Sequence, residues 1–305
     1  MPRYINPYTD FGFKKLFGEE ANKDLLVDFL NELLPDNHKI VELTFKNTEN
    51  LPDLPVERKA VFDILCTAKN GEHFLVEMQK AKINFFKDRA LFYSTFPIRT
   101  QAKQGEWDFR LDPVYMVAIL DFKYDESEEK QKFLRHVQLK DQDCDVFYEK
   151  LHYKFIQMPL FTKTEAELET HFDKWIYFLK KLETFDHIPD ILQEPIFERA
   201  FKVAEVSNFT PIQRDEYEQS RLNYLGVKAA IDTAEMDGVK KGKIEGKIEG
   251  KIEGKIEGKI EGKIEVIFEA WKDGYSVQSV SKLIKLSLTE IESLFKKFES
   301  DSKQG

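Results

Sequence analysis

The chain has few cysteines and no long apolar segment. Its 305 residues include only two cysteines, Cys66 and Cys144, and neither stands at a spacing typical of paired metal ligands. We therefore expect a protein without a disulfide framework or a zinc site, as is usual in a reducing compartment. No stretch approaches the roughly 20 apolar residues that cross a bilayer, and the N-terminus lacks the basic and then apolar order of a signal peptide. These absences predict a cytoplasmic protein that does not contact a membrane.

An excess of positive charge is also missing, because the formal net charge is −9 at pH 7. Lysine and arginine supply most of the affinity of proteins for nucleic acids, since they neutralise phosphates. The composition therefore argues against indiscriminate nucleic-acid binding, and any contact with DNA has to come from a local patch. Residues 80–110 are the clearest candidate, since they hold seven basic and three acidic side chains.

Apolar residues are plentiful enough for a sizeable core. They make up 42% of the chain, with 26 phenylalanines, and their spacing separates helices from strands. Helical spacing occurs at 10–34, before Pro35, and again at 85–101, at about 165–182, and after Pro195 and Pro211. Strand-like runs occur at 41–45, 61–67, 73–78, 113–122, 136–139 and 153–158. This order predicts an α/β fold, with a mixed sheet flanked by helices and followed by an extended helical C-terminal region.

The segment 242–265 repeats Gly-Lys-Ile-Glu six times without a substitution. As a helix it would be marginal alone, because each glycine costs about 1 kcal/mol relative to alanine and like charges face each other at i,i+4. Two interpretations remain open. The segment is either a solvated spacer whose copy number varies, or a helix whose glycine and isoleucine rows pack against a second copy of the chain.

Residues 266–305 return to ordinary sequence. Their apolar spacing predicts a helix, a turn at Gly274, a second helix, a short turn and a third helix, an order that resembles a helix-turn-helix. Six lysines are balanced by six acidic residues, which is poor for holding phosphates. The pattern therefore favours a small dimerisation or regulatory module over a DNA-reading one.

The turn signal Asn70-Gly71 joins two strand-like runs into a hairpin. A two-residue loop would place Asp63 and Glu77 on opposite faces of the sheet. A three-residue loop that also includes Lys69 would place Asp63 directly opposite Glu77. The sequence is compatible with both registers.

In the three-residue register, Asp63, Glu77 and Gln79 converge on one face, because side chains alternate along a strand. Two carboxylates within otherwise apolar strands are unfavourable unless a partner neutralises them. A hard divalent cation such as Mg²⁺ takes carboxylate, water and phosphate oxygens, and it can support in-line hydrolysis of a phosphodiester. A structural ion pair with a lysine or arginine is the alternative.

Asp63, thirteen further residues and then Glu77-Met78-Gln79 resemble the metal-binding core of the PD-(D/E)XK nuclease superfamily. In more detail, the chain is similar to the Rpn-like branch of recombination-promoting nucleases and transposases. The residues that carry this resemblance span about 5–125: Asp10 with Phe13-Lys14-Lys15-Leu16-Phe17, Asp63, Val76-Glu77-Met78-Gln79, Arg89 with Tyr93, Gly105, and Ile119-Leu120-Asp121-Phe122. The repeat segment and the C-terminal helices also fit this branch.

The resemblance implies a restriction-endonuclease-like fold and a metal-dependent DNA endonuclease. Asp63 and Glu77 would be ligands of Mg²⁺, or of another divalent cation such as Mn²⁺ or Ca²⁺, and no organic cofactor is expected. Gln79 stands where the superfamily has a lysine, so it can orient water but supplies no positive charge. Arg89, with Tyr93 four residues later on the same helix, is our candidate for the missing cation; a surface ion pair is the alternative.

Asp10 is a candidate third metal ligand from the first helix, or alternatively the N-cap of that helix. We expect a nuclease-like domain at 1–210 with its catalytic core at about 5–125, a helical linker at 211–265 and a helix-turn-helix-like module at 266–305. The predicted function is hydrolysis of phosphodiester bonds in DNA during recombination or transposition, with self-association through the C-terminal helices as a further hypothesis. The alternative function is a catalytically weak nuclease-fold protein that binds or regulates partners through those helices.

Overall fold

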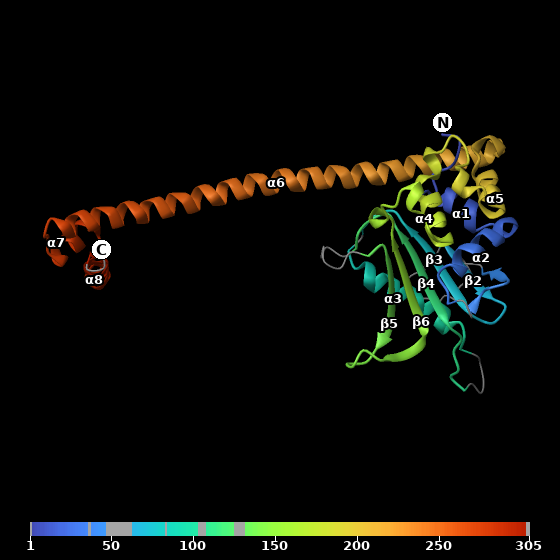
Figure 1. The fold of residues 1–305 in the computed structure, drawn as a ribbon, viewed down its shortest axis with the longest axis horizontal. Helices are drawn as coiled ribbons and strands as arrows, with labels where there is room; N and C mark the ends of the chain where they lie inside the picture. Colours follow the sequence, from blue (N-terminus) through green and yellow to red (C-terminus); the bar gives the residue numbers. More distant parts are fainter. Residues whose placement is uncertain are drawn as a thin grey trace, which may run out of the picture. The chain divides into compact units, whose positions relative to one another are not determined.

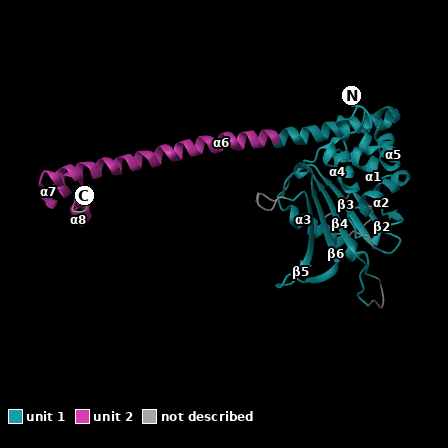
Figure 2. Cartoon of the chain, viewed as in Figure 1, with its two compact units in different colours: residues 1–231 teal, residues 232–305 magenta. Residues whose placement is uncertain are grey.

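The computed structural model describes residues 2–35, 38–46, 63–82, 84–102, 108–124 and 132–302. The chain divides into two compact units, residues 1–231 and 232–305 (Figure 2). Val61 and Phe62 of the expected strand 61–67 lie outside the described residues, as does Gly105. Within the described ranges, no helix has both the length and the apolar character needed to cross a membrane.

The first unit is built on a six-stranded sheet with the order β1-β2-β3-β4-β6-β5. The strands are β1 (Leu43–Phe45), β2 (Ile64–Ala68), β3 (His73–Gln79), β4 (Val114–Leu120), β5 (Leu134–Lys140) and β6 (Val146–Gln157). Antiparallel pairing joins β1 to β2 and β2 to β3, whereas β4 is parallel to both β3 and β6, and β5 is antiparallel to β6. The expected mixed sheet is confirmed.

Helices cover both faces of this sheet (Figure 1). One face packs against α1 (Asp10–Phe17), α2 (Lys23–Asn31), α4 (His171–Lys181) and α5 (Pro195–Ala204), and the other packs against α3 (Phe86–Arg99). Because side chains alternate along a strand, Phe74 and Val76 of β3 enter the first core and Leu75 enters the second. With both faces covered, β4 is buried at every position, which explains its continuous apolar run.

The fourth helix begins later than the apolar spacing over 165–182 predicts. Glu165–Glu167 forms a separate 3-10 turn, and α4 starts only after Thr170. The Thr170 hydroxyl accepts a hydrogen bond from the Asp173 N–H at 3.0 Å, and the Thr170 N–H donates to the Asp173 carboxylate at 3.1 Å. This capping box fixes the helix start, and apolar periodicity alone does not reveal it.

The long helix α6 (Pro211–Lys272) is tied to the first unit by its N-terminal turns. The Tyr217 hydroxyl accepts a hydrogen bond from the Asn6 N–H at 2.9 Å. The Tyr224 hydroxyl donates at 3.0 Å to the carboxylate of Asp121, the residue directly after β4. The start of α6 therefore packs as part of the first unit, where it contacts the segment that precedes α1 and the residue that follows β4.

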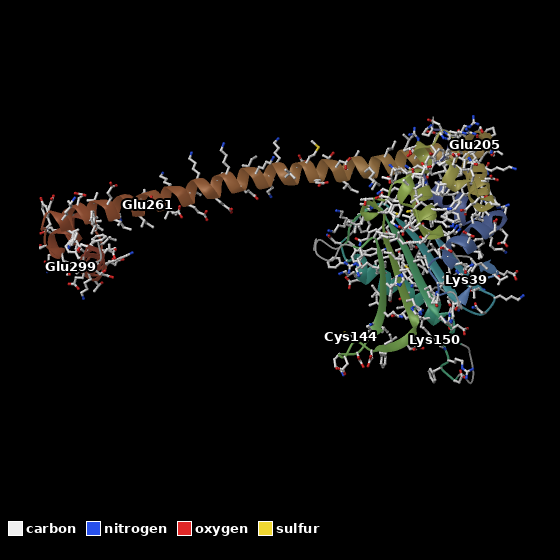
Figure 3. The ribbon with its side chains drawn as sticks, viewed as in Figure 1. Lys39, Cys144, Lys150, Glu205, Glu261 and Glu299 are labelled. Atoms are coloured by element: carbon white, nitrogen blue, oxygen red, sulfur yellow. The ribbon has the colours of Figure 1, made fainter. Side chains whose placement is uncertain are left out.

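In the second unit, the Gly-Lys-Ile-Glu repeats are helical, and their side chains project into solvent (Figure 3). The five isoleucines from Ile244 to Ile260 each keep 52–54% of their surface exposed. A Cβ built on any glycine of the repeats would meet nothing within 4 Å. Within the described residues, these repeats therefore have no packing partner on their glycine row.

The repeats lead into α7 (Val277–Ile284) and α8 (Leu288–Ser302). Gly274, with φ +78°, makes the turn between α6 and α7, in the left-handed region that glycine favours. A small apolar core is centred on one residue from each helix: Ile267, Val280 and Ile291. The predicted order of three helices separated by two turns is confirmed.

The hairpin between β2 and β3 has the register of the three-residue loop. Ile64 pairs with Val76, so Asp63 stands directly opposite Glu77. Gly71 closes the loop with φ +96°, a conformation that glycine adopts without strain. This glycine therefore permits the register on which the relative positions of the two acids depend.

Replacing Gly71 with alanine should destabilise the first unit by roughly 1–2 kcal/mol, because side-chain-bearing residues are strained at positive φ. The new Cβ would also lie 3.0 Å from the Asp112 carboxylate. Urea unfolding followed by circular dichroism measures the change. Gly246→Ala, in the open repeat helix, is the matched control and should favour its helix by about 1 kcal/mol. Unchanged stability of Gly71→Ala would show that the turn does not need glycine.

Candidate metal-binding catalytic site

The centre of the candidate site is the pair of carboxylates that the hairpin register brings together. Glu77 lies in β3 and is only 2% exposed, while Asp63 directly precedes β2. The Asp63 N–H donates to Glu77 Oε1 at 3.1 Å, and the Met78 N–H donates to Asp63 Oδ2 at 2.7 Å. Each carboxylate is therefore held by the backbone of the opposite strand.

The two carboxylates resist ionisation in this arrangement. Burial, followed by the negative charge of Asp63, raises the pKa of Glu77 to about 8. Burial also raises the pKa of Asp63, and the nearby charge of Asp10 acts in the same direction. Both acids will be ionised together at neutral pH only if a positive charge joins them.

Gln79 and Arg89 contact the same oxygen of Glu77. The Gln79 Nε2 donates to Glu77 Oε2 at 2.8 Å, and the Arg89 Nη2 lies 3.8 Å from that oxygen. The Arg89 guanidinium lies over the Tyr93 ring, 4.8 Å from its centroid, and its buried Nε has no hydrogen-bond partner among the residues that the structure describes. The structure thus brings Asp63 and these four side chains together, and the Arg89 guanidinium lies near the buried Glu77 carboxylate.

Asp10 is not the N-cap of α1. The cap is Thr9, whose hydroxyl accepts a hydrogen bond from the Gly12 N–H at 3.0 Å, so that interpretation of Asp10 is wrong. Asp10 Oδ1 instead lies 2.7 Å from the Lys80 Nζ, with the Asp10 side chain 62% exposed. Among the described residues, no group of three or more acidic, histidine or cysteine side chains is arranged to hold a metal ion. Asp10 as a third metal ligand therefore stays a prediction.

The donor set of the carboxylate pair fits a divalent cation with few protein ligands. Two carboxylates are the usual protein contribution to a Mg²⁺ site, with waters and substrate oxygens completing the coordination. Asp63 and Glu77 supply these two groups. A cation between them would offset the burial that raises the pKa of both acids and the negative charge of Asp63 that raises the pKa of Glu77 further. The Gln79 amide oxygen is a further, uncharged oxygen on the same face that can act as a metal ligand.

A cavity of about 330 Å³ lies beside Asp63, and sequence reasoning assigned it no role. Lys14 of α1 and Lys46, at the end of β1, contribute positive charge to its wall, together with the ring of Phe11. Lys14 also lowers the pKa of Asp63, opposing the effect of burial. The sequence signal for Lys14 was its place beside Asp10 in the N-terminal run, whereas Lys46 reaches this cavity only through the pairing of β1 with β2.

The metal-free protein should lose stability as the pH rises toward 8. Unfolded glutamate ionises near its ordinary pKa of 4.5, whereas folded Glu77 keeps its proton up to about 8. The contribution of this raised pKa to the free energy of unfolding is therefore fully present below about pH 4.5 and is lost as the pH rises through 8. Urea unfolding in EDTA near pH 5 and near pH 8 measures this loss. Glu77→Gln should show a smaller loss, and an equal loss in both proteins would contradict the assignment.

Comparison with protein families matches residues 7–234 to the PD-(D/E)XK nuclease family transposases. Comparisons with curated proteins and with solved structures found no match. The matched range covers well over half of the chain and includes the sheet, the helices on both of its faces and both carboxylates. The resemblance seen in the sequence is confirmed: the chain belongs to the PD-(D/E)XK nuclease family transposases.

Proposed function

We propose that this chain is a metal-dependent endonuclease that hydrolyses phosphodiester bonds in DNA. One observation carries the proposal above all others: Asp63 and Glu77 are held face to face, each by a backbone N–H of the opposite strand. The family supports a nuclease-like function and DNA as the class of substrate. Recombination or transposition is the process that such cleavage would serve.

Asp63 and Glu77 would hold the divalent cation, which we expect to be Mg²⁺, with Mn²⁺ or Ca²⁺ as substitutes. Nucleases of this superfamily generally use divalent metals. When bound, the ion acidifies a water molecule and stabilises negative charge on the phosphate. Asp10 would join the two carboxylates only if it left its ion pair with Lys80.

The neighbouring side chains would position water and phosphate. The Gln79 amide N–H group holds Glu77 Oε2, which leaves its carbonyl oxygen to accept a hydrogen bond from the attacking water. Arg89 supplies the positive charge that Gln79 lacks, and the Tyr93 ring supports the guanidinium from one side. The Arg89 side chain is 36% exposed, so its guanidinium could also donate hydrogen bonds to a phosphate oxygen.

Glu77→Gln and Asp63→Asn should each abolish cleavage of supercoiled plasmid in Mg²⁺ or Mn²⁺, because each removes one of the two charges that hold the ion. Glu72→Gln is the matched control. Glu72 is also buried, with 4% of its surface exposed, but it stands at the turn end of the same hairpin, where its carboxylate faces His38. Wild type and this control should cut the plasmid, and EDTA should stop both.

Two outcomes of this plasmid experiment would count against the proposal. Cleavage that persists in both Glu77→Gln and Asp63→Asn would remove the site assignment. Absence of metal-dependent cleavage in every form, including wild type, would contradict the endonuclease and favour a nuclease-fold binding protein that acts through its C-terminal helices.

We expect the DNA backbone to run past the cavity beside Asp63, so Lys14→Gln and Lys46→Gln should weaken binding in a salt-dependent way. A plot of the logarithm of the DNA-binding constant against the logarithm of the salt concentration has a negative slope. Each lost phosphate contact should make this slope shallower by about 0.9. Fluorescence anisotropy with a labelled duplex, in the Glu77→Gln background that keeps the DNA intact, measures this slope. Lys247→Gln in the exposed repeats is the control. If Lys14→Gln and Lys46→Gln change the slope no more than this control does, the DNA backbone does not run past the cavity.

A further inference from the structure

Phe85 stands in an unusual position directly before α3. Its backbone has φ 62° and ψ 32°, in the left-handed region that residues with side chains seldom adopt. Its side chain is 78% exposed, so no packing within the described residues compensates for that conformation. No contact printed for the exposed ring offsets this backbone strain within the described residues, which suggests that the ring meets a partner from outside.

The surroundings of Phe85 favour a negatively charged partner. Among the described residues, no side chain caps the N-terminus of α3, so backbone N–H groups of its first turn can face an anion. Of the described residues that line this position, Lys82 and Lys87 are basic and Asp88 is acidic. The Lys87 ammonium lies 5.6 Å from the centroid of the Tyr124 ring, which holds the lysine beside the aromatic residues.

A cavity of about 260 Å³ opens at this point, and three aromatic side chains line it: Phe85, Phe86 and Tyr124. Asn84 adds an amide that can pair with a polar edge. The volume is below the roughly 300–1,000 Å³ of pockets for drug-sized ligands. It therefore suits one planar ring system rather than a whole nucleotide.

This cavity lies one helical turn from the catalytic site. The Phe85 carbonyl accepts a hydrogen bond from the Arg89 N–H at 2.9 Å, and the Arg89 side chain reaches Glu77. A nucleobase bound against Phe85 would thus have the phosphate of its own nucleotide close to the Arg89 guanidinium. Aromatic faces beside lysines are the usual means of holding unpaired bases together with their backbone.

We propose that this cavity receives one unpaired nucleobase of the DNA substrate, stacked on Phe85. The inference rests on the proposed function and narrows its substrate class to DNA with unpaired bases, such as a bulge, a flap or a single strand. Fully paired DNA offers no base to the cavity, because its bases stay stacked within the duplex. The flanking lysines and the open N-terminus of α3 hold the phosphates of the extruded nucleotide.

Binding tests this inference without any need for cleavage. Fluorescence anisotropy compares a duplex containing a one-nucleotide bulge with the fully paired duplex of the same sequence, in the Glu77→Gln background. The bulged DNA should bind more tightly, and Phe85→Ala should weaken its binding by about 5- to 150-fold, as expected for loss of one base–aromatic stack. Phe85→Tyr, which keeps the ring, should retain the preference.

Phe109→Ala is the matched control, because Phe109 is also 78% exposed and has φ 61°. It should leave the ratio of bulged to paired affinity unchanged. Equal affinity of wild type for the two DNAs, or an equal effect of Phe85→Ala and Phe109→Ala on the ratio, would overturn the inference. The proposed endonuclease would still stand in either case if plasmid cleavage required Glu77. Conversely, a bulge preference that depends on Phe85 in a protein that cuts no DNA would retain the base cavity and remove the enzyme.

Discussion

The mutual hold between Asp63 and Glu77 is the constraint on which the site depends. Each carboxylate accepts a hydrogen bond from the backbone of the opposite strand, and this is satisfied only when the two residues stand directly opposite each other. A slip of one residue would send one carboxylate to the other face of the sheet. Gly71 permits the loop that prevents this slip, so a residue without a side chain decides where the chemistry can occur.

The same pair explains the distribution of charge around it. Burial and repulsion raise the pKa of both acids, so the ionised pair requires positive charge nearby. Arg89 lowers the pKa of Glu77 only in part, since that pKa still lies at about 8, and Lys14 and Lys80 lower the pKa of Asp63. A chain with a net charge of −9 can therefore have a site suited to phosphates, because several of its cations lie close to the two carboxylates.

The fold was largely predictable from the sequence because its signals are local. The continuous apolar run of β4 and the turn at Gly274 each lie within one short segment. The register was not predictable, since an Asn-Gly pair suits loops of two lengths. The partner of Asp10 was missed for a different reason: Lys80 is seventy positions away, and only the packing of α1 beside the end of β3 brings the two charges together. Lys46 likewise lies near the site because β1 pairs with β2, and the residues next to Lys46 in the sequence do not indicate this pairing.

The substitution of glutamine for the lysine of the superfamily changes how the site is neutralised. A lysine at position 79 could form a direct ion pair with Glu77, whereas the Gln79 amide donates only one neutral hydrogen bond. Arg89 stays 3.8 Å from Glu77, beyond hydrogen-bonding distance, and within the described part of the chain its buried Nε has no hydrogen-bond partner. The free protein therefore leaves both its acids and its arginine incompletely satisfied. A divalent cation would neutralise the two carboxylates, and a phosphate would accept hydrogen bonds from the Arg89 guanidinium. The site should therefore reach its final arrangement only when metal and DNA are bound together.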